Sequence, residues 1–231
     1  MPSHNIKVGA QILYKDMTAW TSKLQQWWWR VTARRYKAHS HGSTYIGRNN
    51  TIGRDQEAEA NVWVDITTFK HNYKHQDIWN AKAREQHCIE AVNEVLDELE
   101  ESWYGFGAWL GIPLSGLIKI LFPKVNVHKL KWLSKIFGSG THCTEFSWLV
   151  MKKIAEKEII YKGTPEPQRT HWQYFYNDLM KYNKDIFSPP DQVDLMLVHN
   201  QCWEYIGLSY GEVFLNYRIT KQQRKNITKV K

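Results

Sequence analysis

The chain has 231 residues, of which 42% are hydrophobic and 23% charged, and this ordinary globular usage excludes a collagen, a disordered chain and a multi-span membrane protein. A net charge of +8 combined with 12 Trp and 12 Tyr is typical of a protein that binds nucleic acid or an anionic surface. The alternative, that the tryptophans fill the core of a small domain, stays open.

Three strands are expected in the first third of the chain. Residues 6–14 alternate apolar and polar side chains around a glycine turn, and residues 43–47 and 61–69 are also predicted to be strands. The Asn, Gly and Asp residues within 48–55 favour a turn. The last two strands are therefore expected to form a hairpin or meander.

Residues 78–102 are predicted to form a helix, because apolar residues recur at three- and four-residue spacing while acidic residues occupy the other face. The apolar stretch 103–123 follows, but Pro113 and Lys119 interrupt it, whereas a membrane span needs about 20 continuous apolar residues. We therefore expect no transmembrane segment here. We expect a bent helical element that packs on the domain or lines a cleft.

The second half of the chain is predicted to contain a helix at 143–157, a helix at 170–183, a loop at 188–195 and strands near 202–218. Strands followed by helices and then strands predict an α+β fold in a single domain, residues 1–215. The remaining residues, 216–231, are basic with no acid and predict a solvated tail that could contact nucleic acid or an anionic surface.

Three cysteines, Cys88, Cys143 and Cys202, are too few for a disulfide framework, and their odd number leaves a thiol for chemistry. We therefore expect a reducing compartment. The N-terminal sequence MPSHNIKVGAQ lacks the charged-then-apolar pattern of a signal peptide. A cytoplasmic or virion location is accordingly expected over secretion.

Cys143 is the sharpest local feature of the sequence. It follows the Gly-rich loop 138–142 and begins a predicted helix, where unpaired N–H groups and the helix dipole lower the pKa of a thiol and favour the thiolate. The same N–H groups could stabilise an oxyanion. The alternative is a buried structural cysteine.

A thiolate nucleophile needs a base, and His41 is a candidate because it opens a predicted strand directly after a loop. Glu57 and Glu59 lie on the neighbouring predicted strand, where a carboxylate could fix the tautomer of the imidazole. The alternatives are a surface histidine and two solvated acids.

Metal binding has weaker support in the sequence. The spacings His39-x-His41 and His71-xxx-His75 are workable, but no Cys-x-x-Cys or His-Glu-x-x-His motif accompanies them. The sequence also contains no glycine-rich phosphate loop. We therefore expect no metal and no cofactor.

Six short segments follow one another in the order VGAQIL (8–13), SHGSTYIG (40–47), EAEANVWV (57–64), WYGFGAWLG (103–111), CTEFSWLV (143–150) and SPPDQVDL (188–195). In this order they resemble the circularly permuted papain-like fold of the NlpC-like hydrolase superfamily. The nearest likeness is to its YiiX-like branch, which is related to the lecithin:retinol acyltransferase-like proteins. The resemblance covers residues 6–198.

The resemblance implies a small antiparallel sheet or partial barrel packed against the helix that carries the nucleophile. It implies that Cys143 is the nucleophile, His41 the general base and Glu57 the orienting group, with Glu59 as the alternative third member. The implied activity is that of a bacterial or viral thiol hydrolase, a cysteine peptidase or amidase or a lipid ester or amide hydrolase, which forms an acyl-enzyme. Its implied substrates are peptides, peptidoglycan or lipid-like molecules.

The sequence departs from the family pattern at Ala10, where an acid is usual, and at Gly42, Ser43 and Phe146, where other apolar residues are usual. The competing hypothesis is a non-catalytic binding or virion assembly protein whose triad is inactive. Its basic, Trp-rich segment 27–37 would then contact nucleic acid or a membrane.

Overall fold

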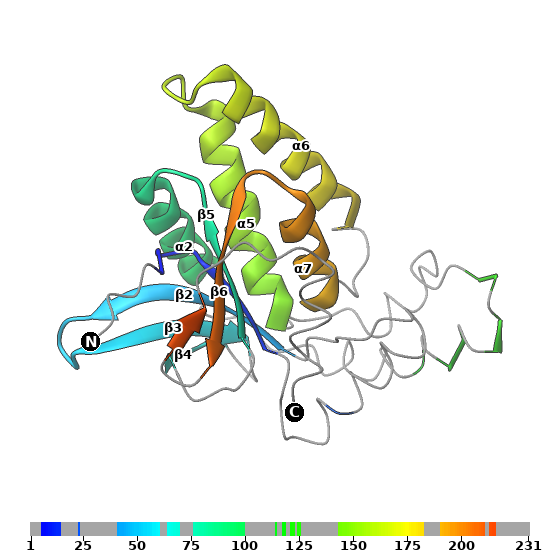
Figure 1. Cartoon of the computed structure of the whole chain (residues 1–231), viewed down its shortest axis with the longest axis horizontal. Helices are drawn as coiled ribbons and strands as arrows, with labels where there is room; N and C mark the ends of the chain where they lie inside the picture. The colour runs from blue at the N-terminus through cyan, green and yellow to red at the C-terminus, as the bar shows by residue number, and fades with distance from the viewer. Residues whose placement is uncertain are drawn as a thin grey trace.

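The computed structural model describes residues 6–14, 23, 41–60, 64–69, 76–99, 114, 117–118, 121–122, 124–125, 143–182, 190–210 and 213–215. These residues form an α+β fold, as the sequence predicts, with an antiparallel sheet and helices packed against it (Figure 1). The basic tail, residues 216–231, and the Trp-rich segment 27–37 lie outside the described residues.

The sheet has seven strands in the order β4-β3-β2-β1-β5-β6-β7, and every neighbouring pair is antiparallel. The strands are β1 (Gln11–Tyr14), β2 (His41–Asn49), β3 (Arg54–Ala60), β4 (Val64–Thr68), β5 (Gln76–Ala81), β6 (Trp203–Tyr210) and β7 (Val213–Leu215). The first strand therefore lies in the middle of the sheet, between strands that follow it in the sequence.

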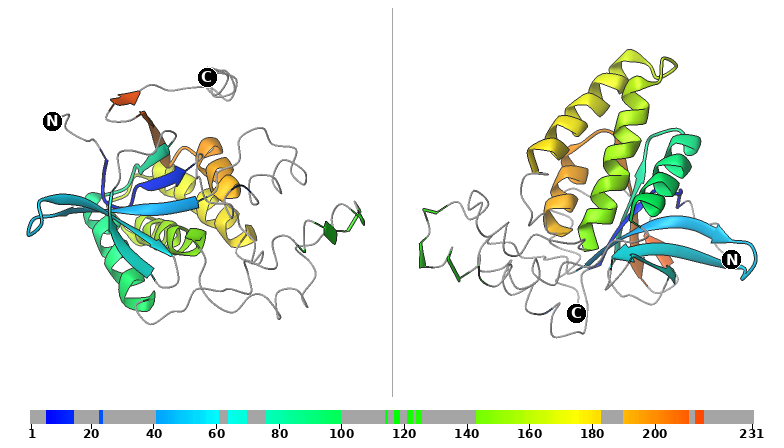
Figure 2. Two further views of the ribbon diagram at one scale, coloured as in Figure 1. Left: turned by 90° about the horizontal axis from the view of Figure 1, so that it is seen from below. Right: turned by 180° about the vertical axis from the view of Figure 1, so that it is seen from behind.

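The helices of the described part are α2 (Glu85–Leu99), α5 (Cys143–Ile160), α6 (Glu166–Tyr182) and α7 (Pro190–His199). They gather on one side of the sheet, and α5 packs between α2 and α6 (Figure 2). Because α5 also contacts β2 and β3, the helix that begins at Cys143 lies directly on the strands that carry His41 and Glu57.

Alternation along the strands divides the sheet into two faces. Leu13 and Ala58 point toward the helices and join the main core with Phe146 and Ile154 of α5. Their neighbours in sequence point the other way, where a second buried cluster holds Ile6, Ala10, Ile12, Tyr14, Tyr45, Phe69, Ile78 and Ile206. Both faces of the central strands are therefore buried.

Gly9 explains how α5 approaches the sheet so closely. It has a φ of +83°, and a Cβ atom placed on it would lie 3.1 Å from Cδ1 of Ile154. Its N–H donates to the carbonyl oxygen of Tyr45. A glycine is required here both by the left-handed backbone and by the nearby helix, which agrees with the predicted glycine turn.

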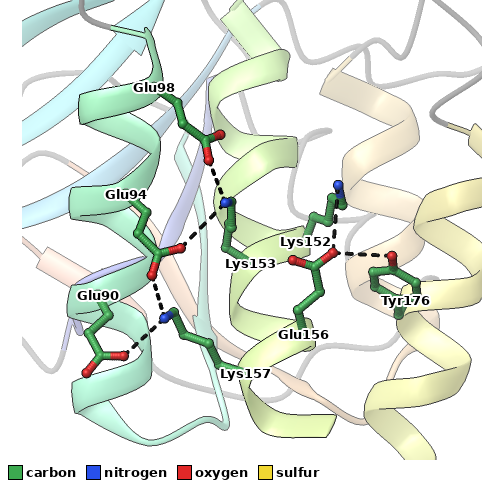
Figure 3. A network of polar contacts seen from close by, with 8 residues as sticks. All are labelled: Glu90, Glu94, Glu98, Lys152, Lys153, Glu156, Lys157 and Tyr176. Carbon is green, nitrogen blue, oxygen red and sulfur yellow. Dashed lines mark hydrogen bonds and ion pairs between the residues drawn. The ribbon is translucent and has the colours of Figure 1, made fainter. Parts of the chain in front are cut away.

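Charged side chains hold α5 against α2 (Figure 3). Nζ of Lys153 lies 2.5 Å from Glu98 and 3.5 Å from Glu94, and Nζ of Lys157 lies 2.6 Å from Glu94 and 3.1 Å from Glu90. Solvent weakens each of these partly exposed pairs, so together they set the position of α5 along α2 more than they stabilise the fold.

The β2–β3 hairpin confirms the predicted turn but not the predicted strand limits. Oδ1 of Asn49 accepts the N–H of Thr51 at 2.9 Å, and Gly53 has a φ of +65°, which is the expected turn chemistry. The strand predicted at 61–69 contains β4, and a further strand, β3, precedes it from Arg54 to Ala60.

Two further expectations are corrected. The helix predicted at 78–102 starts only at Glu85, because residues 76–81 form the buried strand β5. The loop predicted at 188–195 contains the start of α7 at Pro190, which suits a helix N-terminus because proline needs no N–H partner there. The predicted helices at 143–157 and 170–183 are confirmed as α5 and α6, and the final strands as β6 and β7.

Most of the apolar stretch 103–123 lies outside the described residues. Within it, the N–H of Phe122 donates to the carbonyl oxygen of Ile118, which is a helical hydrogen bond. Leu117, Leu121 and Phe122 are each more than half exposed, so these three side chains do not pack on the domain as predicted. In the described part of the chain, no helix combines the length and apolarity that crossing a bilayer requires.

Candidate active site

His41 is the first residue of β2, where it pairs with Tyr14 at the end of β1. Its Nε2 lies 2.7 Å from Oε2 of Glu59, and the two side chains are only 14% and 19% exposed. An ionised carboxylate can only accept, so Nε2–H donates to Glu59. The direct carboxylate partner of His41 is therefore the alternative that the sequence offered.

Glu57 lies two residues earlier on β3 and on the same face of the sheet. It is 3% exposed, and its Oε2 accepts hydrogen bonds from the hydroxyl of Tyr14 and, at 2.6 Å, from Oγ of Ser43. Burial raises the pKa of this carboxyl, while the two hydroxyl donors oppose the rise. Glu57 is therefore hydrogen-bonded to Tyr14 and Ser43, whereas Glu59 is hydrogen-bonded to His41.

The ring of Tyr14 connects these two carboxylate contacts. Its centroid lies 5.7 Å from that of the His41 imidazole, with an angle of 37° between the planes. Burial, and then the negative charge of Glu57, raises the pKa of Tyr14 well above its ordinary value, so the phenol stays neutral and donates to Glu57. Five side chains from three adjacent strands therefore form one polar cluster: Tyr14, His41, Ser43, Glu57 and Glu59.

Tyr14 and Ser43 were not found by sequence reasoning. A signal exists for Ser43, since His41, Ser43 and Tyr45 alternate on β2 and so share a face with the acids of β3. No comparable signal exists for Tyr14, because its place beside His41 depends on the pairing of β1 with β2, which are separated by a long stretch of chain.

Cys143 is the first residue of α5, and His41 is the first residue of β2. Oγ of Ser147 lies 3.2 Å from Oγ1 of Thr44, and Ile154 lies at Gly9. Followed backward from Ile154 to Ser147, α5 thus runs toward the beginning of β2, and Cys143 lies one turn further on. The side chain of His41 lies on the face of β2 opposite the one on which Thr44 contacts α5.

The side chain of Cys143 itself lies outside the described part of the structure. The predicted contact between its sulfur and the imidazole of His41 therefore stays a prediction. The other two cysteines are described and are buried. Burial is the main cause that raises the pKa of both Cys88 and Cys202 to about 12, so neither is a nucleophile near neutral pH.

The described residues contain no group of three or more His, Cys, Asp or Glu side chains that could hold a metal ion. Of the histidines whose spacing is workable for a metal, His39, His71 and His75 lie outside these residues. Comparisons of the chain with protein-family models, with curated proteins and with solved structures found no match.

Proposed function

We propose that the protein is a cysteine-dependent hydrolase of the permuted papain-like type, in which Cys143 is the nucleophile, His41 the base and Glu59 the group that orients the base. The observation that carries the proposal is the 2.7 Å contact between Nε2 of His41 and Glu59 at the start of β2. An antiparallel sheet packed on the helix that begins at Cys143 supports it.

The chemistry follows from the tautomer. With Nε2–H donated to Glu59, Nδ1 of His41 takes the proton of the Cys143 thiol, and the sulfur attacks a carbonyl carbon. Backbone N–H groups in the first turn of α5 stabilise the oxyanion, and the imidazolium returns its proton to the departing amine or alcohol. Water then attacks the thioester, with His41 as base, and releases the acid and the free thiol. Glu59 stabilises the imidazolium throughout.

Selective thiol labelling tests this proposal. Iodoacetamide should alkylate Cys143 at pH 6 much faster than Cys88 or Cys202, since their buried thiols have pKa values near 12. Replacement of His41 by Ala should move the Cys143 profile back toward alkaline pH. The hydrolase proposal fails if the three cysteines react at similar rates in the folded protein, or if His41→Ala leaves the profile unchanged.

The substrate is proposed only by class: a peptide or peptidoglycan amide, or a lipid ester or amide. A panel of peptide anilides and acyl esters of increasing chain length, assayed with the Cys143→Ser variant as the control, separates these classes. Turnover that persists in Cys143→Ser would show that another group catalyses the reaction.

A second candidate function, attachment to an anionic lipid surface without catalysis, has one specific observation in its favour. Leu117, Leu121 and Phe122 are more than half exposed. The sequence from Ser102 to Thr144 around them contains no acidic residue, while it contains Lys119, Lys124, Lys129, Lys131 and Lys135. Exposed apolar side chains among lysines are typical of a surface that binds anionic lipid.

Vesicle sedimentation tests this candidate. The protein should sediment with vesicles of phosphatidylcholine and phosphatidylserine but not with phosphatidylcholine alone, and the double replacement Leu121→Ser with Phe122→Ser should weaken the binding. Tyr174→Ser is the matched control, since Tyr174 is also exposed but lies on α6. Equal binding by both variants, or salt-sensitive binding to DNA alone, would contradict a lipid surface.

A further inference from the structure

Tyr14 contacts both parts of the polar cluster at once. Its hydroxyl donates to the buried carboxylate of Glu57, while its ring lies against the imidazole of His41. The two residues are also register partners, since Tyr14 at the end of β1 pairs with His41 at the start of β2. The side chain is almost fully buried, with 2% exposed. The hydrogen bond, the ring contact and the strand pairing together fix the position of the Tyr14 side chain.

Glu57 supplies the anchor for this tyrosine. It is buried, and it accepts from Tyr14 and from Ser43, which together offset part of the cost of burying a carboxylate. Its pKa is also lowered by the charge of His41 and raised by that of Glu59, so all three ionisable groups lie close enough to affect one another. A buried carboxylate here costs stability that an apolar residue would not, which favours a functional reason for its presence.

A hydrogen bond at one nitrogen does not by itself orient an imidazole, because a ring that turns can present its other nitrogen to the same carboxylate. The ring of Tyr14, tilted by 37° with its centroid 5.7 Å away, adds a restraint on this rotation.

We infer that Tyr14, anchored by Glu57, is a positioning residue that holds the imidazole of His41 in the orientation in which Nε2 faces Glu59 and Nδ1 faces the nucleophile. This inference rests on the proposed function for the role of Nδ1. It divides the two carboxylates of β3 between two tasks: Glu59 binds the base directly, and Glu57 acts through the tyrosine.

The same strands offer a matched control. The hydroxyl of Tyr45 donates to Oδ1 of Asp55 at 2.8 Å, and its ring packs edge-on against Phe69, with 5.9 Å between centroids. Tyr45→Phe therefore removes one tyrosine–carboxylate hydrogen bond from the same face of the sheet. The hydrogen bond that it removes joins Tyr45 to a carboxylate other than Glu57 and Glu59.

Two measurements on Tyr14→Phe, Glu57→Gln, their combination and Tyr45→Phe test the inference. Two-bond ¹H–¹⁵N spectra of labelled histidine report the tautomer of His41, assigned with His41→Gln. Alkylation of Cys143 by iodoacetamide from pH 5 to pH 9 reports the reactivity of the thiol. The pH profile and the tautomer are readouts that a loss of stability alone would not move.

Wild type should show the single Nε2–H tautomer of neutral His41. Tyr14→Phe and Glu57→Gln should each show a tautomer mixture and slow the alkylation at pH 6 by about tenfold, the equivalent of one lost hydrogen bond. The combined variant should lose no more than the worse single variant, because both act on one contact. Tyr45→Phe should match wild type in both measurements.

The inference is overturned if Tyr14→Phe keeps the wild-type tautomer, whatever happens to its melting temperature. If wild-type Cys143 shows no selective reactivity, the proposed hydrolase fails, but the tautomer measurement still decides the role of Tyr14. Should Tyr14→Phe not fold, Glu57→Gln decides in its place, since it removes the anchoring charge and keeps the tyrosine. A wild-type tautomer in Glu57→Gln would then overturn the inference.

Discussion

Replacement of Glu59 by Gln tests the hydrogen bond between Glu59 and His41, on which the proposed site depends. The hydrogen bond to Nε2 of His41 is 2.7 Å long, and both side chains are less than one-fifth exposed, so solvent screens it little. A hydrogen bond to a charged group contributes about 1.5–3 kcal/mol. Since about 1.4 kcal/mol corresponds to a tenfold change in rate, we expect roughly a 10- to 100-fold loss.

The assay is the second-order rate constant of Cys143 alkylation at pH 6, read from the tryptic peptide by mass spectrometry. Glu98→Gln is the matched control, because it removes the same charge from a carboxylate of α2, one that pairs with Lys153 of α5. Glu98→Gln should stay within about twofold of wild type, as expected for a surface pair. A Glu59→Gln rate equal to that of Glu98→Gln would refute the orienting role of Glu59.

Three further outcomes are expected from thermal melts. Burial raises the pKa of Glu57 above its ordinary value of 4.5, so the stability that this carboxyl contributes is present below that value and is lost as the pH rises through the raised pKa. Glu57→Gln should therefore gain stability relative to wild type between pH 4 and pH 7. A stability difference that stays constant over this range would contradict the argument. Glu158→Ala should cost about 1–3 kcal/mol, since buried Glu158 accepts the N–H of Arg84 at the start of α2; no change in melting temperature would contradict the cap. Gly9→Ala should cost about 1 kcal/mol or more, because of its positive φ and the contact with Ile154; a neutral result would show that the helix shifts freely.

The sequence predicts the α+β class and the main helices because these depend on local signals, namely apolar spacing and turn residues. It does not predict the limits of β3, since Arg54–Ala60 is mostly polar and is held as a strand by pairing with β2 on one side and β4 on the other. It also misses β5, where Asn80 is buried yet satisfied by the distant N–H of Lys7. Partners far away in sequence decide both.

The candidate site shows the same limit. The sequence identifies His41 and both acids, but Glu57 and Glu59 occupy the same face of one strand and differ only in their position along it. Which of them meets His41 depends on the register of β3 against β2, and that register shifts at a bulge between Tyr45 and Gly47. The resemblance assigns Glu57 from its place in the sequence, which does not contain this shift.

The two faces of the sheet bury different groups. Toward the helices, small residues such as Ala58 let α5 pack closely, and the lysine pairs of Figure 3 fix the helix along α2. On the other face, the same strands bury a carboxylate, Glu57, whose raised pKa marks a cost to folding. A chain selected for stability alone would replace that group with an apolar one. Its presence beside Tyr14 and His41 is what would be expected if the cluster is kept for the reactivity that it gives the imidazole.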